Sequence, residues 1–195
     1  MILAIDKRTN ATLMRECAVL GYLPGVVLDM TYNVGAFWRE YQPSMLIAMD
    51  IDASYGVMVA DAMRLPFAND SVDTVVFDPP YKLNGTSTGI GASALDHRYG
   101  VHGSYVPAAV RHELLLNGTS EACRVARQYV LVKCADQISS GRYNPQTYMV
   151  WQRAIEHGCT LIDSLHVLGG REQPAGTRQL HARRNYSTLM VFGMP

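Results

Sequence analysis

Three short apolar segments of the sequence each end in an aspartate. They are VVLD (26–29), MLIAMD (45–50) and VDTVVFD (72–78). Near-continuous apolar runs of this length are typical of strands buried on both faces, as in a parallel sheet covered by helices. Ligands of such sheets bind beyond the carboxyl ends of the strands. The pattern therefore predicts an α/β domain whose functional residues follow the strands directly.

Three further apolar segments, YVLVK (129–133), TLIDSLHVL (160–168) and STLMVFG (187–193), are also expected to be strands. A chain of 195 residues is long enough for one such domain and too short for two ordinary ones. We therefore expect a single domain over residues 1–195 in which strands alternate with helices.

Two helices have start or stop signals in the sequence. Thr9 or Asn10 is expected to cap the first helix, because both side chains can accept a hydrogen bond from the first turn. The second is expected to have Asn144 as its cap, Pro145 in its first turn and Gly158 at its end.

The composition is that of a globular protein. Hydrophobic residues make up 48% of the chain and charged residues 17%, which excludes an intrinsically disordered chain. The sequence has no apolar run of about eighteen residues, the length needed for a membrane span. Its start, MILAIDKRTNATLM, lacks the apolar core and cleavage site of a signal peptide. We expect a cytoplasmic protein.

The 4 cysteines are widely separated, with no CxxC pair and no Cys/His cluster. Disulfide frameworks and zinc sites depend on such clustering. We therefore expect free, buried thiols and no metal site.

The formal net charge is zero, but the charges are unevenly distributed. Residues 1–96 contain 6 Lys or Arg and 11 Asp or Glu, whereas residues 97–195 contain 11 and 6. This asymmetry indicates an acidic half suited to a cationic ligand and a basic half suited to an anionic one.

The loop after the first strand, DMTYNVGAFW (29–38), has features of a ligand-binding loop. Asp29 stands at the strand tip, Thr31 follows it, and Gly35 is small enough for the backbone to approach a ligand closely. The loop does not match GxGxxG, and an ordinary strand-to-helix turn explains it equally well.

Acidic residues also follow the next elements. Asp50 ends the second strand, where an acid in a βαβ unit can accept both hydroxyls of a ribose. Its alternative role is that of a surface carboxylate or a helix cap. Asp61, in MVADAMRLPF, follows another short strand and is a candidate acceptor for an adenine amino group, or else an ordinary loop acid.

The strongest signal is VDTVVFDPPY (72–81), in which a buried strand ends in Asp78 and is followed at once by Pro79, Pro80 and Tyr81. Pro80 biases Pro79 toward an extended conformation, which sets the direction of its carbonyl. The Asp78 carboxylate and this carbonyl can accept hydrogen bonds from an aromatic amine and favour the positive charge that develops on its nitrogen during attack. Tyr81 offers a flat face for stacking. A proline-stiffened turn with a capping aspartate is the alternative.

The residues Asp78-Pro79-Pro80-Tyr81 resemble the catalytic motif of DNA amino-methyltransferases, which form N6-methyladenine or N4-methylcytosine. RNA guanine-N2 methyltransferases share this motif. The preceding LPFANDSVDTVVF and the loop DMTYNVGAFW are similar to the corresponding segments of these families, although Asn33-Val34 stands where a glycine is common. The resemblance covers roughly residues 25–82, with a looser likeness in the last strands.

This resemblance implies the Rossmann-like three-layer α/β/α fold of class I methyltransferases, with a mostly parallel sheet and an antiparallel last strand. It implies S-adenosylmethionine as cofactor, with its ribose on Asp50 and its adenine near Asp61. The implied cofactor-binding residues are Asp29, Thr31, Gly35, Asp50, Asp61 and Asp78. The implied reaction is direct transfer to an amino nitrogen of an extruded base, without a metal. Its implied catalytic residues are Asp78, Pro79, Pro80 and Tyr81.

Two loops are candidates for holding the substrate. Residues 82–104 are glycine-rich and are expected to form a flexible lid, or else an insertion without function. Residues 169–186 form a basic loop suited to phosphate, or else a solvated loop. The candidate substrate-binding residues are Lys82, Arg178, Arg183 and Arg184. The expected partner is a nucleic acid, DNA rather than RNA, and a homodimer or a partner subunit can supply target recognition.

Several alternatives remain open from the sequence. Asp78 favours adenine N6, because cytosine-N4 enzymes more often have serine in that place, but a cytosine-N4 or an RNA amino-methyltransferase also matches the motif. A non-catalytic subunit that binds cofactor or nucleic acid is a further alternative. The absence of GxGxxG disfavours a dehydrogenase, and a small-molecule methyltransferase does not need the Asp-Pro-Pro-Tyr corner.

Overall fold

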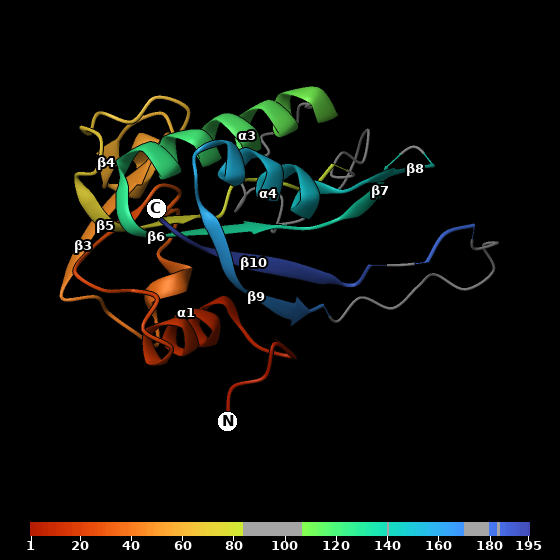
Figure 1. The fold of residues 1–195 in the computed structure, drawn as a ribbon, viewed down its shortest axis with the longest axis horizontal. Helices are drawn as coiled ribbons and strands as arrows, with labels where there is room; N and C mark the ends of the chain where they lie inside the picture. Colours follow the sequence, from red (N-terminus) through yellow and green to blue (C-terminus); the bar gives the residue numbers. More distant parts are fainter. Residues whose placement is uncertain (84–106, 140, 170–179, 183) are drawn as a thin grey trace.

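Figure 1 shows a twisted central sheet with helices packed on both of its faces. The computed structural model describes residues 1–83, 107–139, 141–169, 180–182 and 184–195. Within these ranges, no helix combines the length and the apolar character needed to cross a membrane.

Within the described residues, the main sheet has 8 strands in the order β1-β9-β10-β6-β5-β2-β3-β4. The strands are β1 (Ile5–Asp6), β2 (Val26–Asp29), β3 (Met45–Asp50), β4 (Met58–Val59), β5 (Val72–Phe77), β6 (Ala126–Cys134), β9 (Thr160–Leu168) and β10 (Tyr186–Gly193). β10 runs antiparallel to both of its neighbours, β6 and β9, whereas the pairs among β2 to β6 are parallel. The predicted mostly parallel sheet with an antiparallel last strand is confirmed.

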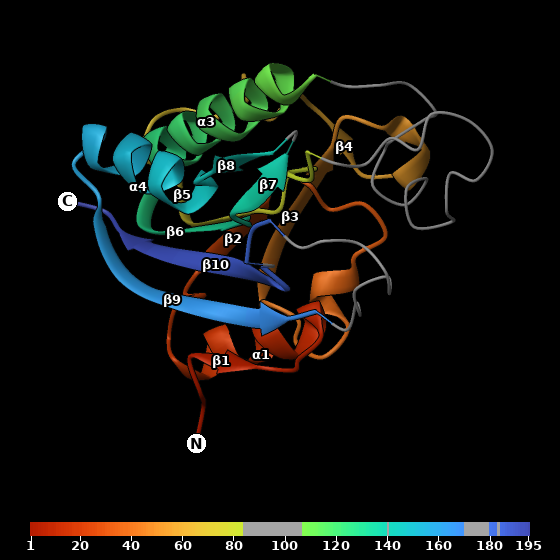
Figure 2. The same ribbon diagram turned by 90° about the vertical axis from the view of Figure 1, so that its right-hand side faces the viewer.

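The helices lie on opposite faces of this sheet (Figure 1, Figure 2). One face is covered by α1 (Asn10–Val19) and the short 3-10 helix η1 (Ala36–Trp38), which contact each other. The other face is covered by α3 (Ala108–Val125) and α4 (Gln146–Glu156). A second 3-10 helix, η2 (Ala53–Tyr55), follows β3, and a hairpin of β7 (Gln137–Ser139) and β8 (Arg142–Asn144) follows β6.

Side chains of the central strands alternate between two hydrophobic clusters, one on each face. Val76 belongs to the cluster beside α1, and the next residue, Phe77, belongs to the cluster beneath α3 and α4. Because successive side chains of a strand point to opposite faces, Asp78 continues on the α1 side. The same alternation carries Asp29 on β2 and Lys133 on β6 to that side. The sheet pattern therefore gathers three charged residues on one face.

A glycine allows α3 to pack closely on β5. A Cβ built on Gly118 would lie 2.3 Å from Cζ of Phe77, so a larger residue requires the ring to move. Glycine inside a helix costs about 1 kcal/mol relative to alanine. The close approach of the phenylalanine ring explains why the helix nevertheless has glycine here.

The two predicted helices are present, with one correction. Thr9 caps α1, since its Oγ1 accepts a 3.0 Å hydrogen bond from the Thr12 N–H. The prediction of Asn144 as the cap of α4 is wrong, because this residue ends β8 and pairs with Gln137. Pro145, expected in the first turn, stands at the cap position, and α4 begins at Gln146. The segment DMTYNVGAFW (29–38) ends in the single 3-10 turn of η1.

The strands predicted at 26–29, 45–50 and 160–168 are confirmed at those bounds. β6 begins earlier than predicted, at Ala126. Neither α3 nor the β7–β8 hairpin was predicted. α3 contains Asn117-Gly118, a dipeptide that favours turns. The cysteines are free and buried, as expected.

Candidate functional site

Asp29, at the tip of β2, is 3% exposed. Its Oδ1 accepts a 3.0 Å hydrogen bond from the Thr31 N–H, and its Oδ2 accepts a 2.7 Å bond from Nε1 of Trp38. Burial raises the pKa of Asp29 to about 7, helped by the nearby carboxyl groups of Asp78 and Asp50 and opposed by the two hydrogen bonds. The loop after β2 therefore holds a fixed carboxyl group that titrates near neutral pH.

Two hydrogen bonds join this loop to the neighbouring strand tips. The Asp78 N–H donates to Oγ1 of Thr31 at 2.9 Å, and the Asn33 N–H donates to Oδ2 of Asp50 at 2.8 Å. Oδ1 of Asp50 accepts a further 3.0 Å bond from the Asp52 N–H. A carboxylate has about four lone-pair sites, so Asp50 keeps acceptor capacity. The predicted residues at the tips of β2, β3 and β5 thus form one connected site.

The loop contains two left-handed residues, Asn33 with φ of 50° and Gly35 with φ of 65°. Asparagine and glycine are the residues that best tolerate this region. A Cβ on Gly35 would also lie 2.6 Å from the hydroxyl oxygen of Tyr32. Gly35 is therefore required by the turn itself, which differs from the expected reason, close approach of a ligand. Asn33 keeps the backbone conformation that a glycine would give.

Asp78 directly follows β5, and 16% of its side chain is exposed. Burial raises the pKa of its carboxyl group, whereas the ammonium groups of Lys133 and Lys82 lower it. Lys133 Nζ lies 3.5 Å from Oδ2 of Asp78. The next turn is tight, because the Tyr81 N–H donates to the Pro79 carbonyl at 2.7 Å. A carbonyl oxygen has two lone pairs, so Pro79 can accept a second hydrogen bond.

The carbonyls of Pro80 and Tyr81 are held by later elements of the chain. Arg111 on α3 donates from Nη1 to the Pro80 carbonyl at 2.6 Å. The Tyr81 carbonyl accepts from Nε2 of Gln137 on β7 at 2.8 Å and from Nε2 of Gln146 on α4 at 2.9 Å. Arg111 and Gln146 are both buried. The corner is therefore held by hydrogen bonds from three elements, α3, α4 and the hairpin.

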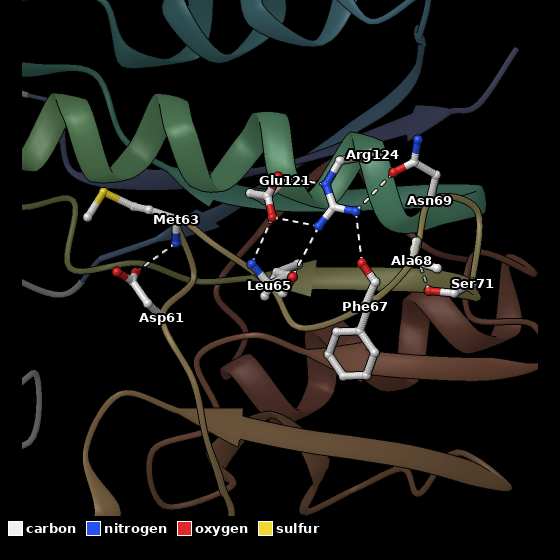
Figure 3. Close-up of polar contacts among 9 residues, drawn as sticks. All are labelled: Asp61, Met63, Leu65, Phe67, Ala68, Asn69, Ser71, Glu121 and Arg124. Carbon is white, nitrogen blue, oxygen red and sulfur yellow. Dashed lines mark hydrogen bonds and ion pairs between the residues drawn. The ribbon is translucent and has the colours of Figure 1, made fainter.

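Asp61 lies on the loop between β4 and β5, which Arg124 clamps to α3 (Figure 3). Arg124 donates to the carbonyls of Leu65 at 3.2 Å and Phe67 at 2.8 Å, and forms a 2.7 Å ion pair with Glu121. Glu121 in turn accepts a 2.7 Å bond from the Leu65 N–H. The clamp fixes the course of the loop. Asp61 makes no hydrogen bond to the tips of β2, β3 or β5 within the part of the chain that the structure describes.

Two of the predicted substrate-binding residues, Lys82 and Arg184, are described by the structure. Lys82 is exposed beside the corner. The Arg184 guanidinium carbon lies 4.2 Å from the ring centre of Tyr143, an exposed residue of β8. Arg184 therefore meets the β7–β8 hairpin, which is itself joined to the corner by its first residue. Arg178, Arg183, residues 84–104 of the predicted lid and residues 170–179 of the predicted basic loop lie outside the described residues.

Four residues that contact the corner after β5 were not predicted from the sequence, namely Lys133, Arg111, Gln137 and Gln146. Lys133 had a signal, because it is a charged residue at the carboxyl end of the predicted strand YVLVK. The other three belong to no motif, and they reach the corner only through the packing of α3, α4 and the hairpin.

The site can accept hydrogen bonds from N–H donors of a ligand and favours a ligand with positive charge. Three carboxyl groups, Asp29, Asp50 and Asp78, lie at adjacent strand tips, and Asp29 responds electrostatically to the other two. Across the described ranges, no group of three or more His, Cys, Asp or Glu side chains is arranged to hold a metal ion.

No protein-family model matches the sequence, and a comparison with curated proteins finds no match. Solved structures do match. The chain is similar to a candidate RNA methyltransferase from Pyrococcus horikoshii, with a TM-score of 0.59 and 16% identity over 95% of this chain and 82% of that one. It is similar to the magnesium protoporphyrin IX methyltransferase of Synechocystis PCC 6803 with bound SAH, with a TM-score of 0.58 and 13% identity over 95% and 81%.

A SAM-dependent methyltransferase from Aquifex aeolicus also matches, with a TM-score of 0.50 and 12% identity over 95% of this chain and 93% of that one. At such low identities these likenesses show the fold. The chain has the Rossmann-like α/β fold of class I methyltransferases, as the resemblance implied.

Proposed function

We propose that this chain is an S-adenosylmethionine-dependent methyltransferase that acts on an exocyclic amino group of a nucleic-acid base, with adenine N6 in DNA as the first candidate. The observation that carries the proposal is the corner after β5. There the Asp78 backbone N–H bonds to Thr31 of the acidic loop after β2, and the Asp78 carboxyl group pairs with Lys133. The carbonyl of the next residue, Pro79, accepts from the Tyr81 N–H.

The acidic loop fits the proposed cofactor. When bound, S-adenosylmethionine supplies an electrophilic methyl group on a positively charged sulfonium. A cation near Asp29 favours the ionised form of this buried carboxyl group, whose pKa is about 7. Asp50 has acceptor capacity left for the hydroxyls of a ribose. We assign contacts near Thr31 and Gly35 to the rest of the cofactor, and the adenine amino group to Asp61.

The corner suits an aromatic amine as the target. The lone pair of such an amine is delocalised into the ring, which makes the nitrogen a poor nucleophile. Asp78 and the Pro79 carbonyl accept hydrogen bonds from its two N–H groups, orient the nitrogen and favour the positive charge that develops on it. Tyr81 provides a ring on which an extruded base stacks. A small-molecule substrate without an amino group would leave both acceptors unused.

The charge of the second half of the chain supports a polyanionic substrate. Residues 97–195 contain 11 Lys or Arg and 6 Asp or Glu. We assign phosphate contacts to Lys82 and Arg184, and to Arg178 and Arg183 of the basic loop. A second copy of the chain or a partner subunit supplies target recognition in this proposal.

One experiment tests the proposal directly. The protein is incubated with methyl-labelled S-adenosylmethionine and, in separate reactions, with duplex DNA, single-stranded DNA and RNA, and the products are digested to nucleosides and identified by mass. Labelled N6-methyl-2′-deoxyadenosine from DNA is the expected product. Labelled N4-methyl-2′-deoxycytidine, or label in RNA alone, would identify one of the alternative targets. No labelled nucleoside from any substrate, together with intact cofactor binding by calorimetry, would favour the non-catalytic subunit.

A further inference from the structure

Lys133 is a buried lysine that points at the proposed catalytic carboxylate. It is 5% exposed and lies next to the end of β6, on the same side of the sheet as Asp78. Its Nζ lies 3.5 Å from Oδ2 of Asp78 and donates a 2.9 Å hydrogen bond to Oδ1 of Asn10, the first residue of α1. The same ammonium lies 5.6 Å from the ring centre of Phe37 and 5.8 Å from that of Tyr81.

This environment fixes the ammonium group. Asn10 accepts one of its three N–H donors, and two aromatic faces add cation–π attraction, which is strongest for desolvated cations. An ammonium group moved from water into a protein interior needs such partners, because burial without them strongly disfavours its charged form. Lys133 is therefore built to stay charged beside Asp78.

The charges around Asp78 come from several elements. Lys133 faces it from β6 and Lys82 from the segment directly after it, and the carboxyl group of Asp29 approaches from β2. The buried thiol of Cys134, next to Lys133, also responds to its charge. Lys82 is exposed to solvent, so water screens its charge. Lys133 is thus the buried counter-charge among these groups.

We propose that Lys133 is a positioning residue, which holds the Asp78 side chain ionised and aimed at the target amine. This inference rests on the proposed function, since the aim of the carboxylate matters only when an amine is the substrate. An ionised carboxylate accepts hydrogen bonds, whereas a protonated one would present an O–H donor to the amine. Lys133 keeps the accepting form and holds one oxygen, leaving the other for the substrate.

The test compares variants by two independent measurements. Lys133→Gln removes the charge and keeps an amide that can donate to Asn10, whereas Lys133→Arg keeps the charge. Lys7→Gln is the control, at an exposed lysine near the start of the chain. NMR of 13C-labelled aspartate carboxyl groups, assigned with Asp78→Asn, gives the titration midpoint of Asp78 in the protein without substrate. The pH profile of methyl transfer is recorded in parallel.

In Lys133→Gln we expect the midpoint of Asp78 to rise by about one pH unit or more, since an opposite charge within 4–6 Å lowers a carboxyl pKa by about 1–3 units. The acid limb of the activity profile moves with it, so that activity recovers toward alkaline pH. Lys133→Arg stays close to wild type in both measurements, and Lys7→Gln is unchanged. If Lys133→Gln does not fold by circular dichroism, Lys133→Met serves in its place, because its side chain fills the same space without a charge.

An unchanged Asp78 midpoint in a folded, uncharged Lys133 variant would overturn the inference. So would an activity loss that is the same at every pH in that variant and persists in Lys133→Arg, because it would indicate a packing defect alone. A shifted midpoint in a protein that methylates no nucleoside would refute the proposed function instead, and the coupling of Lys133 to Asp78 would stand.

Discussion

The indole N–H of Trp38 donates a 2.7 Å hydrogen bond to Oδ2 of Asp29, and both side chains are buried. The two residues lie at opposite ends of the loop after β2, so this bond closes the loop on itself. The tip of the strand and the end of η1 are thereby held in one geometry, and the carboxyl group cannot turn toward water without breaking the bond.

A pH dependence of stability follows from the buried state of Asp29. Its pKa is about 7 in the folded protein, against an ordinary value of 3.8, so the unfolded chain releases the proton first as pH rises. The stability tied to this group is therefore fully present below about pH 4 and is lost as pH rises to about 7. The loss is up to about 4 kcal/mol for a shift of this size. Asp29→Asn does not titrate in this range, and its single amide oxygen can accept from only one of the two N–H donors, Thr31 and Trp38. Its stability should therefore be lower at acid pH but fall less than that of the wild type between pH 4 and pH 8.

Urea unfolding of the wild type and of Asp29→Asn at several pH values between 4 and 8 measures this effect. The difference between the two curves is the quantity of interest, because histidines and other groups titrate in the same range in both proteins. Parallel curves would contradict the assignment of a raised pKa to Asp29.

Asp78→Asn is expected to lower methyl transfer by at least about 100-fold, the usual cost of removing one preorganised electrostatic interaction from a transition state. Cofactor affinity, measured by calorimetry, should fall far less than activity, because Asp29 and Asp50 remain in place. The matched control is Asp6→Asn at an exposed position of β1. Retention of wild-type activity in Asp78→Asn would remove Asp78 from the catalytic role.

Gly118→Ala should destabilise the fold by about 1–3 kcal/mol, although alanine is the better helix former. The new methyl group would meet the Phe77 ring at 2.3 Å. Thermal or urea unfolding gives the decrease in stability. The same substitution made in a Phe77→Leu background should cost clearly less, and an equal cost in both backgrounds would argue against a clash with this ring.

Arg184→Ala, alone and combined with Arg183→Ala, should weaken substrate binding and lower the slope of log affinity against log salt by about one for each phosphate group that the variant no longer binds. Arg127→Gln is the control, because Arg127 lies at the amino end of β6, whereas the site lies at the carboxyl ends of the strands. Titrations at several salt concentrations give the slopes. Slopes equal to wild type would exclude a phosphate role for these arginines.

The fold was largely predictable because the strands that form the sheet are apolar and end abruptly. The segments ending in Asp29, Asp50 and Asp78 indicated both the strand bounds and the edge of the sheet that carries the site. The long helix α3 was not predictable in the same way. Its Asn117-Gly118 favours a turn, and only its tertiary contact with Phe77 explains the glycine.

The site was predictable where residues follow a strand and less so where contact depends on packing. Thr31 and Asp78 are 47 positions apart in the sequence, but they follow neighbouring strands and are joined by a 2.9 Å hydrogen bond at the predicted edge of the sheet. Arg111 and Gln146 hold the corner from helices, and nothing in their local sequence indicates a partner at Pro80 or Tyr81. Such long-range hydrogen bonds become visible only when the layers are assembled.

The hydrogen bonds from Arg111, Gln137 and Gln146 to the carbonyls of Pro80 and Tyr81 have a consequence for biosynthesis. The ribosome synthesises the Asp-Pro-Pro-Tyr segment before Arg111, Gln137 and Gln146. The nascent protein must therefore carry an unsupported motif until the second half of the chain has folded over it. If these four residues were grafted onto another strand tip, the graft would have the acceptors without the hydrogen bonds that hold them, and we expect it to be inactive.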